Sequence, residues 1–331
     1  MSKTIIVTGG CGYIGSHVAR AFKNADPNNR VVVIDRVERP HTLKNLDGFV
    51  IADFSSYEAI STVLSLQPDV LVHCAGTSLV GPSVTDPAEY YDNNIRKTLK
   101  LLDVIKDMPK KPLIMFSSSA SVYGLPDRLP ITESSPKKPI SPYGNTKSMT
   151  EDILSDYRRA YGVDSICFRY FNAAGAEPFN FDLGQEPGAT HIVARALEAS
   201  LAKKAFTING DDFNTVDGTC VRDYVHVWDI ATAHVKGAEF FFSVNQEQTS
   251  AVAFVFNLGT NSGTSNKQIV DYVAGCYGLP FVNYGPRRNG DPDELVADAS
   301  FARNILEWKP EFSDIETIID SAYKWYSSGI R

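Results

Sequence analysis

Short apolar runs alternate with longer amphipathic segments over the first half of the 331-residue chain. The runs are apolar almost throughout, which is typical of parallel strands buried on both faces and joined by crossover helices. The predicted strands are Thr4 to Thr8, Arg30 to Asp35, Phe49 to Asp53, Asp69 to Ala75, Pro112 to Ser118 and Asp164 to Phe171. The predicted helices are Gly12 to Phe22, Ser56 to Leu66, Pro87 to Asp107 and Pro142 to Tyr161. This alternation predicts an α/β protein with a doubly wound parallel sheet.

The pattern changes after Asn172. Residues 173–190 are rich in Gly, Pro and acidic side chains, which indicates a loop that leads into a smaller, partly interleaved α/β lobe. We predict helices over Ile192 to Ala202 and from Asn266, Ser300 and Ile315, strands at Phe206 to Ile208 and Val252 to Leu258, and a segment from Arg222 to Phe242 that becomes helical after Val227. We therefore divide the chain into residues 1–172 and 173–331, with parts of 222–258 packing back on the first domain.

Composition narrows the class of protein. Apolar residues make up 43% and charged residues 21% of the chain, which fits a folded globular protein. The net charge is −7 and no run of lysine and arginine exceeds two residues, so the sequence lacks the basic surface that nucleic-acid binding needs. No apolar stretch approaches 18 residues, so we expect no membrane span.

The cysteines and histidines suggest neither a disulfide framework nor a metal site. The five cysteines are widely spaced and form no C-x-x-C pair, which indicates reduced thiols and a cytoplasmic protein. The histidines lack ligand spacing, and the acidic loop from Asp211 to Asp217 misses the alternation of a calcium loop. We expect no metal.

A glycine-rich turn joins the first strand to the first helix. Gly9, Gly12 and Gly15 would allow a tight turn, close approach to a pyrophosphate and close helix packing, although glycines also serve ordinary turns. Asp35 ends the next strand 20 residues past Gly15, where its carboxylate can accept hydrogen bonds from the adenosine ribose. This placement favours NAD over NADP. Arg36 beside it leaves a 2′-phosphate contact open.

Tyr143 and Lys147 stand four residues apart at the start of a predicted helix, so their side chains share one face. An ammonium beside a phenol favours the phenolate, which would lower the tyrosine pKa from about 10 toward neutrality. This spacing arises about once by chance in a chain of this composition. Its position supports a role in catalysis, because Ser119 ends a buried strand at the carboxyl edge where such sheets bind ligands, and can hydrogen-bond the same substrate hydroxyl.

Longer motifs give the chain a family resemblance. They are the run Thr8 to Gly15, the serine triplet ending at Ser119 with Val122, Tyr123 and Gly124, Ser141-Pro-Tyr-Gly-Asn-Thr-Lys147, and Arg169-Tyr-Phe-Asn172. Together they resemble the extended short-chain dehydrogenases/reductases, which have the Rossmann fold. The segments Asp217 to His226 and Gly285 to Asp291 narrow the resemblance to the UDP-glucose 4-epimerases, and it covers essentially the whole chain.

The resemblance implies an isomerase of galactose metabolism that keeps NAD tightly bound. In that family NAD+ oxidises the sugar at C4, the Tyr143 phenolate takes the hydroxyl proton, and Lys147 holds the nicotinamide ribose. The 4-keto sugar then rotates and receives the hydride on its other face. Family members usually form homodimers through the Tyr143 helix and the helix that carries Tyr90 and Leu102.

The resemblance also assigns binding residues. Those implied around NAD are Gly9, Gly12, Tyr13, Ile14, Gly15, Asp35, Asp53, Phe54, Cys74, Ala75, Gly76, Ser78, Asn94, Ser119, Tyr143, Lys147 and Phe171. Those implied around the UDP-sugar are Ser119, Tyr143, Asn172, His191, Ile192, Thr207, Asn209, Arg222, Arg288, Asp291 and Leu295, with Arg222 and Arg288 best suited to grip the diphosphate and Leu295 beside the sugar's 2-substituent.

Three positions depart from the family pattern. Ser78 stands where many members have lysine, residues 190–192 replace a frequent Asn-Asn-Leu, and Arg36 follows Asp35 in place of asparagine. A 4-epimerase of UDP-N-acetylhexosamines or UDP-pentoses therefore stays open. A 4,6-dehydratase is disfavoured because Ala120 and Ser121 occupy the place of its Asp-Glu pair. A noncatalytic NAD-binding regulator would not need Ser119, Tyr143 and Lys147 together.

Overall fold

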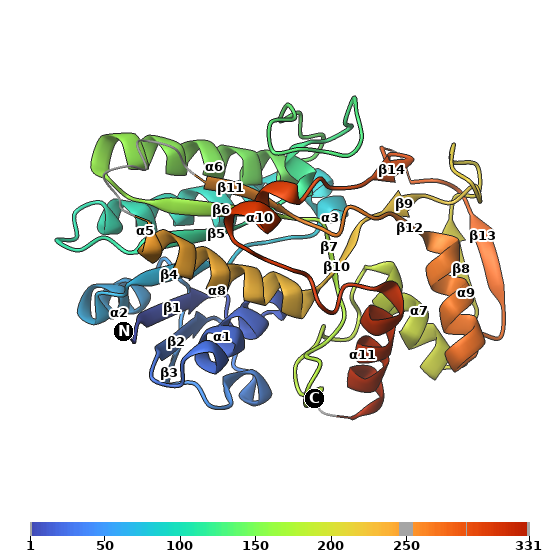
Figure 1. Cartoon of the computed structure of the whole chain (residues 1–331), viewed down its shortest axis with the longest axis horizontal. Helices are drawn as coiled ribbons and strands as arrows, with labels where there is room; N and C mark the ends of the chain where they lie inside the picture. The colour runs from blue at the N-terminus through green and yellow to red at the C-terminus, as the bar shows by residue number, and fades with distance from the viewer. Residues whose placement is uncertain (1, 245–253, 289, 330–331) are drawn as a thin grey trace.

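The computed structural model describes residues 2–244, 254–288 and 290–329. A seven-stranded, all-parallel sheet in the order β11-β6-β5-β4-β1-β2-β3 forms its centre (Figure 1). The strands from the first half of the chain are β1 (Thr4–Thr8), β2 (Arg30–Asp35), β3 (Gly48–Ile51), β4 (Val70–His73), β5 (Leu113–Ser119) and β6 (Ser165–Tyr170). The chain reverses its winding between β1 and β4, so ligands are expected beyond the carboxyl ends of these strands. The predicted doubly wound fold is confirmed.

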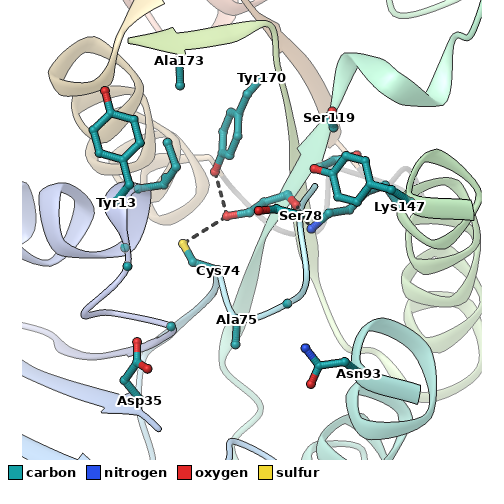
Figure 2. Close-up of a pocket in the computed structure, with 18 of the residues that line it drawn as sticks. Tyr13, Asp35, Cys74, Ala75, Ser78, Asn93, Ser119, Lys147, Tyr170 and Ala173 are labelled. Atoms are coloured by element: carbon teal, nitrogen blue, oxygen red, sulfur yellow. Dashed lines mark hydrogen bonds between the residues drawn. The ribbon is translucent and has the colours of Figure 1, made fainter. Parts of the chain in front are cut away.

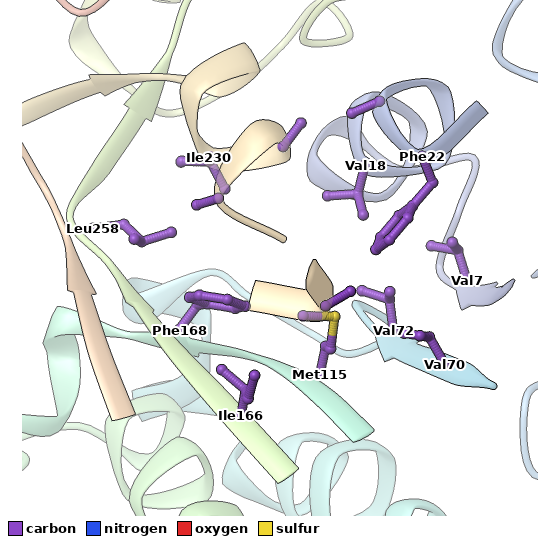
Figure 3. Close-up of a cluster of buried hydrophobic side chains, with 14 of the residues drawn as sticks. Val7, Val18, Phe22, Val70, Val72, Met115, Ile166, Phe168, Ile230 and Leu258 are labelled. Atoms are coloured by element: carbon purple, nitrogen blue, oxygen red, sulfur yellow. The ribbon is translucent and has the colours of Figure 1, made fainter. Parts of the chain in front are cut away.

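Helices cover both faces of the sheet because strand side chains alternate between the faces. On one face, α1 (Tyr13–Ala25) and α8 (Val227–Ser243) pack on a core that includes Val7, Val72, Met115 and Phe168 (Figure 3). On the other face, α2 (Tyr57–Leu66), α5 (Lys97–Ile105) and α6 (Pro142–Tyr161) pack on a second core. The two cores hold the strand ends, and therefore the site, in fixed positions.

The second half of the chain contributes to this central sheet. Strand β11 (Phe254–Leu258) pairs in parallel with β6, and α8 lies beside α1. The first residues of the strand predicted from Val252 lie outside the described residues. The sheet thus combines residues from both halves of the sequence.

A smaller lobe lies beyond the carboxyl ends of the strands (Figure 1). Its core is formed by α7 (Ile192–Leu201), α9 (Asn266–Tyr277) and α11 (Ile315–Ser327) around β8 (Phe206–Asn209). Short strands complete it and join it to the large sheet: β7 (Asn172–Ala174) with β10 (Tyr224–His226), β8 with β13 (Val282–Gly285), and β9 (Val221–Arg222) between β12 (Thr264–Ser265) and β14 (Glu294–Leu295). Helix α10 (Ser300–Ile305) packs against β11.

The predicted helix from Pro87 to Asp107 is helical without a gap as far as Ile105, but its middle is π-helical. It consists of α4 (Pro87–Tyr91), a π-helical turn η2 (Asp92–Arg96) and α5, with an additional short helix α3 (Val80–Thr85) before it. Short 3-10 turns lie at η1 (Pro40–Leu43) and η3 (Ala120–Val122). Among the described residues, no helix is long and apolar enough to cross a membrane.

Candidate active site

The phosphate turn is shaped by close backbone contacts that exclude side chains. Gly9 has a φ of +68°, and a Cβ there would lie 2.7 Å from the Ala75 nitrogen. A Cβ at Gly15 would lie 2.2 Å from the Gly9 carbonyl oxygen. Helix α1 starts after Gly12 with no side-chain cap, so its first N–H groups are left for a ligand. A glycine cradle at a helix N-terminus fits the pyrophosphate of a dinucleotide.

Asp35 lies at the end of this cleft, as the position of β2 predicts (Figure 2). Its two carboxylate oxygens accept hydrogen bonds from the backbone of Cys11 at 3.0 Å and of Val37 at 3.1 Å, which fix the side chain. Arg39 also lines the cleft and donates to the Cys11 carbonyl at 2.9 Å, while its Nε lies 3.4 Å from Glu186. This end of the cleft thus presents one fixed carboxylate with Arg36 and Arg39 beside it.

The predicted catalytic residues meet at the other end of the cleft. Ser141 caps α6 by accepting a hydrogen bond from the Gly144 nitrogen at 3.1 Å, which sets the start of the helix and places Tyr143 in its first turn. Lys147, one turn later, donates to the Ser117 carbonyl at 2.7 Å. Tyr143 and Lys147 are 8% and 6% exposed and line the cleft together with Ser119. The structure therefore brings Ser119, Tyr143 and Lys147 together.

Burial controls the charges of this trio. It raises the pKa of Tyr143 to about 12, and the nearby Ser119 hydroxyl offsets only part of this rise. Burial also lowers the pKa of Lys147 to about 8, although Cys74 and Glu151 act to raise it. The expected lowering of the Tyr143 pKa by Lys147 is therefore wrong for the protein alone. The reason is that loss of solvent dominates, and Lys147 points its ammonium at Ser117.

The cleft has a volume of about 450 Å³. Most of the predicted cofactor residues line it, together with two predicted sugar residues: Gly9, Gly12, Tyr13, Ile14, Gly15, Asp35, Phe54, Cys74, Ala75, Gly76, Ser78, Ser119, Tyr143, Lys147, Phe171, Asn172 and His191. One continuous cleft thus joins the phosphate turn to the catalytic trio.

Two predicted cofactor residues lie outside the lining of the cleft. Asp53 binds Lys97 at 2.7 Å, and Asn94 holds Thr77 and Thr146 through its side chain. The adjacent Asn93 lines the cleft instead, because the π-helical turn changes which side chains face it. The cofactor roles of Asp53 and Asn94 stay predictions.

The remaining predicted sugar residues lie in the smaller lobe, outside the cleft lining. Arg222 lies 3.7 Å from Asp291, and Arg288 donates two hydrogen bonds of 3.1 Å to Asn209 in the amide orientation that satisfies both groups. Desolvation and the Arg288 guanidinium lower the pKa of His191. The positive charge of Arg288 therefore reaches a residue that lines the cleft. The others are Ile192 on α7, Thr207 on β8 and Leu295 on β14. The Leu295 side chain packs against the small apolar cluster that contains Phe171.

Sequence reasoning missed a chain of hydrogen bonds that runs from the cleft wall into the core. The Tyr170 hydroxyl lies 2.9 Å from Ser117 Oγ and 2.8 Å from His234 Nε2, and Ser117 lies 3.0 Å from the Cys74 sulfur (Figure 2). His234 Nδ1 faces the Ile230 carbonyl, so it carries the proton and Nε2 accepts from Tyr170. No spacing in the sequence links these residues. Only the adjacency of β4, β5, β6 and α8 brings them together.

The fold and the cleft define a class of protein: a Rossmann-type oxidoreductase fold with a dinucleotide cradle and a Ser-Tyr-Lys trio. Residues 5–259 match the NAD dependent epimerase/dehydratase family, and the chain belongs to that family. A group of three histidine, cysteine, aspartate or glutamate residues able to hold a metal is absent from the part of the chain that the structure describes.

Relatives of known name are similar over nearly the full length. UDP-glucose 4-epimerase of Streptococcus mutans is 41% identical over 98% of this chain and 97% of its own. The crystal structure of UDP-glucose 4-epimerase from Brucella ovis in complex with NAD has a TM-score of 0.89 at 37% identity, covering 97% of this chain and 98% of that one. The enzyme from Bifidobacterium longum in complex with NAD+ and UDP has a TM-score of 0.88 at 33% identity, with 98% of both chains covered.

Proposed function

We propose that this protein is an NAD-dependent 4-epimerase that interconverts UDP-glucose and UDP-galactose. The observation that carries the proposal is the single cleft in which the glycine cradle, Asp35 and the Ser119–Tyr143–Lys147 trio meet. The names of the relatives, which are UDP-glucose 4-epimerases at up to 41% identity, support the choice of substrate.

The residues of the cleft fit NAD. Gly12, Gly15 and the first turn of α1 would hold the pyrophosphate, Asp35 would accept the adenosine ribose hydroxyls, and Lys147 would hold the nicotinamide ribose. When bound, NAD supplies the hydride acceptor that oxidises the sugar at C4 and the hydride donor that reduces it again. The reaction has no net redox change, so the cofactor has no reason to leave between the two halves.

Tyr143 is the proton acceptor for the sugar hydroxyl. Its Oη, ionised in the assembled complex, would take the C4 hydroxyl proton while the C4 hydrogen leaves as hydride to the acceptor that bound NAD would supply, and it would return the proton to the C4 oxygen when the hydride comes back. Ser119 lines the cleft together with Tyr143, and its hydroxyl would hydrogen-bond the same sugar oxygen when the substrate is bound. The low exposure of Tyr143 and Lys147 keeps bulk water away from this proton.

Inversion at C4 requires the sugar ring to turn while the nucleotide stays bound. Arg222 and Arg288 in the smaller lobe would hold the diphosphate by charge-assisted hydrogen bonds, whereas Asn172 and His191 line the cleft where the sugar would turn. The anchor and the reacting carbon are thus held by different parts of the protein.

The direct test is to incubate the purified protein with a panel of UDP-sugars and to separate the C4 epimers. UDP-glucose and UDP-galactose are expected to interconvert, whereas N-acetylated or pentose sugars as the preferred substrates would support the alternative epimerases. Tyr143→Phe should lower turnover by ~10²- to 10⁴-fold. Tyr157→Phe, on the same helix but bonded to Asp103, is the matched control and should keep wild-type turnover. Near-native turnover of Tyr143→Phe would refute the assignment.

We also propose that the enzyme is a homodimer. Exposed apolar side chains gather on α3, α4 and α6, which contact one another: Val84 is 64% exposed, Met149 42% and Tyr91 37%. Such a surface is typical of a subunit interface. Val84→Asp should lower the sedimentation mass toward one chain, whereas Tyr57→Asp on α2 should not. A wild-type protein that sediments as one chain would contradict this proposal.

We place the enzyme in the cytoplasm, because all five cysteines are free thiols and UDP-sugar chemistry requires none of them to be oxidised. Cell fractionation with an antibody to the protein tests this location. Recovery in an oxidising compartment would contradict it.

A further inference from the structure

Two of the three consecutive serines at the end of β5 are hydrogen-bonded to residues of α6. The Ser117 carbonyl accepts from Lys147 at 2.7 Å and the Ser118 hydroxyl donates to Glu151 at 2.6 Å, while Ser119 lines the cleft together with Tyr143. Tyr143, Lys147 and Glu151 follow at intervals of four residues, so they share one helical face. These contacts fix how far α6 can slide or rotate against the strand.

Glu151 is the member of this series that no step of the proposed reaction uses. Its carboxylate is 4% exposed and forms a two-pronged ion pair with Arg169, with Nε at 2.9 Å and Nη2 at 2.6 Å. Arg169 is itself 5% exposed and also donates to the Tyr123 hydroxyl at 2.8 Å. A buried ion pair adds little net stability over an apolar pair of similar shape, so its position needs another explanation.

We propose that Ser118, Glu151 and Arg169 act as positioning residues that set the register of α6 and balance the charge one turn from Lys147. The inference rests on the proposed function, because it assigns a purpose to the charge of Lys147. Glu151 stabilises the Lys147 ammonium, and Arg169 limits that effect by neutralising the carboxylate. The Glu151–Arg169 pair thereby keeps the pKa of Lys147 in the range where the ammonium can exchange its proton near neutral pH.

All charged and titratable groups that face Lys147 enter this balance. Tyr143 and Glu151 lie on α6 with Lys147. His73 at the end of β4 and Cys74 after it interact electrostatically with the Lys147 ammonium. On β5, the centre of the Phe116 ring lies 4.8 Å from Lys147 Nζ. Arg169 acts on Glu151 from β6, and Lys137 lies 3.6 Å from the same carboxylate. Glu151 is an anion that does not line the cleft, so its charge can be removed by mutation without changing the cleft wall.

The test uses opposite changes of charge. In the full-length protein with ¹³C-labelled lysine, the titration of Lys147 is followed by NMR and assigned by loss of its signal in Lys147→Arg. Glu151→Gln should lower the Lys147 midpoint by about one pH unit, and Arg169→Gln should raise it. The double variant should return it close to the wild-type value. The alkaline limb of the kcat profile should move in the same directions.

Two variants separate charge from geometry. Arg169→Lys keeps the charge, so the Lys147 midpoint should stay in place while kcat falls as the two-pronged contact is lost. Ser118→Ala keeps both charges and removes one hydrogen bond, so kcat should fall severalfold with an unchanged midpoint and an unchanged KM for UDP-glucose. A purely structural ion pair would move the midpoint in the same direction in both Gln variants, or not at all, and either result overturns the proposal.

The two proposals fail in different ways. The NMR titration requires no turnover, so a wild-type protein that epimerises no UDP-sugar would refute the proposed function and leave the charge balance measurable. If the single Gln variants do not fold, the Ser118→Ala and Arg169→Lys proteins decide the matter. Wild-type kcat in both would then overturn the positioning role.

Discussion

Replacing Gly15 by alanine is expected to damage both the fold and the dinucleotide cradle. The added Cβ would lie 2.2 Å from the Gly9 oxygen and 2.8 Å from the Gly10 Cα. These are backbone atoms of the turn itself and cannot rotate aside, so the start of α1 has to move by roughly 1 Å to reach ordinary contact distance. Overpacking of this kind costs about 1–3 kcal/mol, which corresponds to a melting temperature lower by several degrees.

Gly12→Ala is the informative comparison. Gly12 has a φ of −76°, which any residue adopts, and its Cβ would lie 3.1 Å from the nearest atom outside its neighbours, the Gly9 oxygen. The Gly9 oxygen would have to move by only a few tenths of an ångström, so Gly12→Ala should lower the melting temperature much less than Gly15→Ala. Because Gly12 lines the cleft, the methyl group should still weaken NAD binding by about tenfold or more, which is ~1.4 kcal/mol.

The assay measures NAD bound per chain after gel filtration, the dissociation constant of NAD, and the melting temperature. Gly275→Ala in α9 is the control, since a Cβ there meets no atom within 4 Å, and alanine in a helix should be neutral or slightly stabilising. The expected order is loss of both stability and NAD binding in Gly15→Ala, loss of NAD binding with a much smaller loss of stability in Gly12→Ala, and neither loss in Gly275→Ala. Wild-type NAD binding in Gly15→Ala would refute the account of the turn.

Two further predictions concern acid stability and substrate choice. Burial lowers the pKa of His17 and His234 to about 4 and of His73 and His226 to about 3, so only the unfolded chain takes up these protons as the pH falls below about 6.5. The free energy of unfolding should therefore fall by ~2 kcal/mol per histidine at pH 5, and an equal melting temperature at pH 7.5 and pH 5 would contradict this. Leu295→Ala should raise the specificity constant for UDP-N-acetylglucosamine relative to UDP-glucose, with an effect of about 1–3 kcal/mol, and an unchanged ratio would show that the pocket is shaped elsewhere.

The elements nearest the cleft were the most predictable from the sequence. Strands β1 and β2 and helix α6 have the predicted bounds, because continuous apolar runs, a glycine turn and a Ser-Pro helix start are local signals. In the smaller lobe β8 was predicted within one residue, whereas the two-residue strands were missed. Strands β9, β12 and β14 have two residues each and depend on partners far along the chain, so no periodicity marks them.

The site shows the same division between local and long-range information. Local motifs predicted the position of Ser119, Tyr143 and Lys147, but not the pKa values of the last two, since burial depends on the whole fold. The contacts of Glu151 and Tyr170 could not be predicted from the sequence either. In the sequence, nothing distinguishes Glu151 from the other acidic residues of an amphipathic helix. Only the structure shows that its side chain is buried against Arg169.

The electrostatics of the cleft explain why Tyr143 can hold its proton until a ligand arrives. A Tyr143 phenolate beside a Lys147 ammonium requires the tyrosine to lose its proton before the lysine does. In the protein alone, burial makes the lysine lose its proton first, because it raises the pKa of Tyr143 to about 12 and lowers that of Lys147 to about 8. At neutral pH the tyrosine is therefore a neutral phenol. A positive charge brought into the cleft would favour the phenolate, so the proton acceptor is expected to become competent only in the assembled complex.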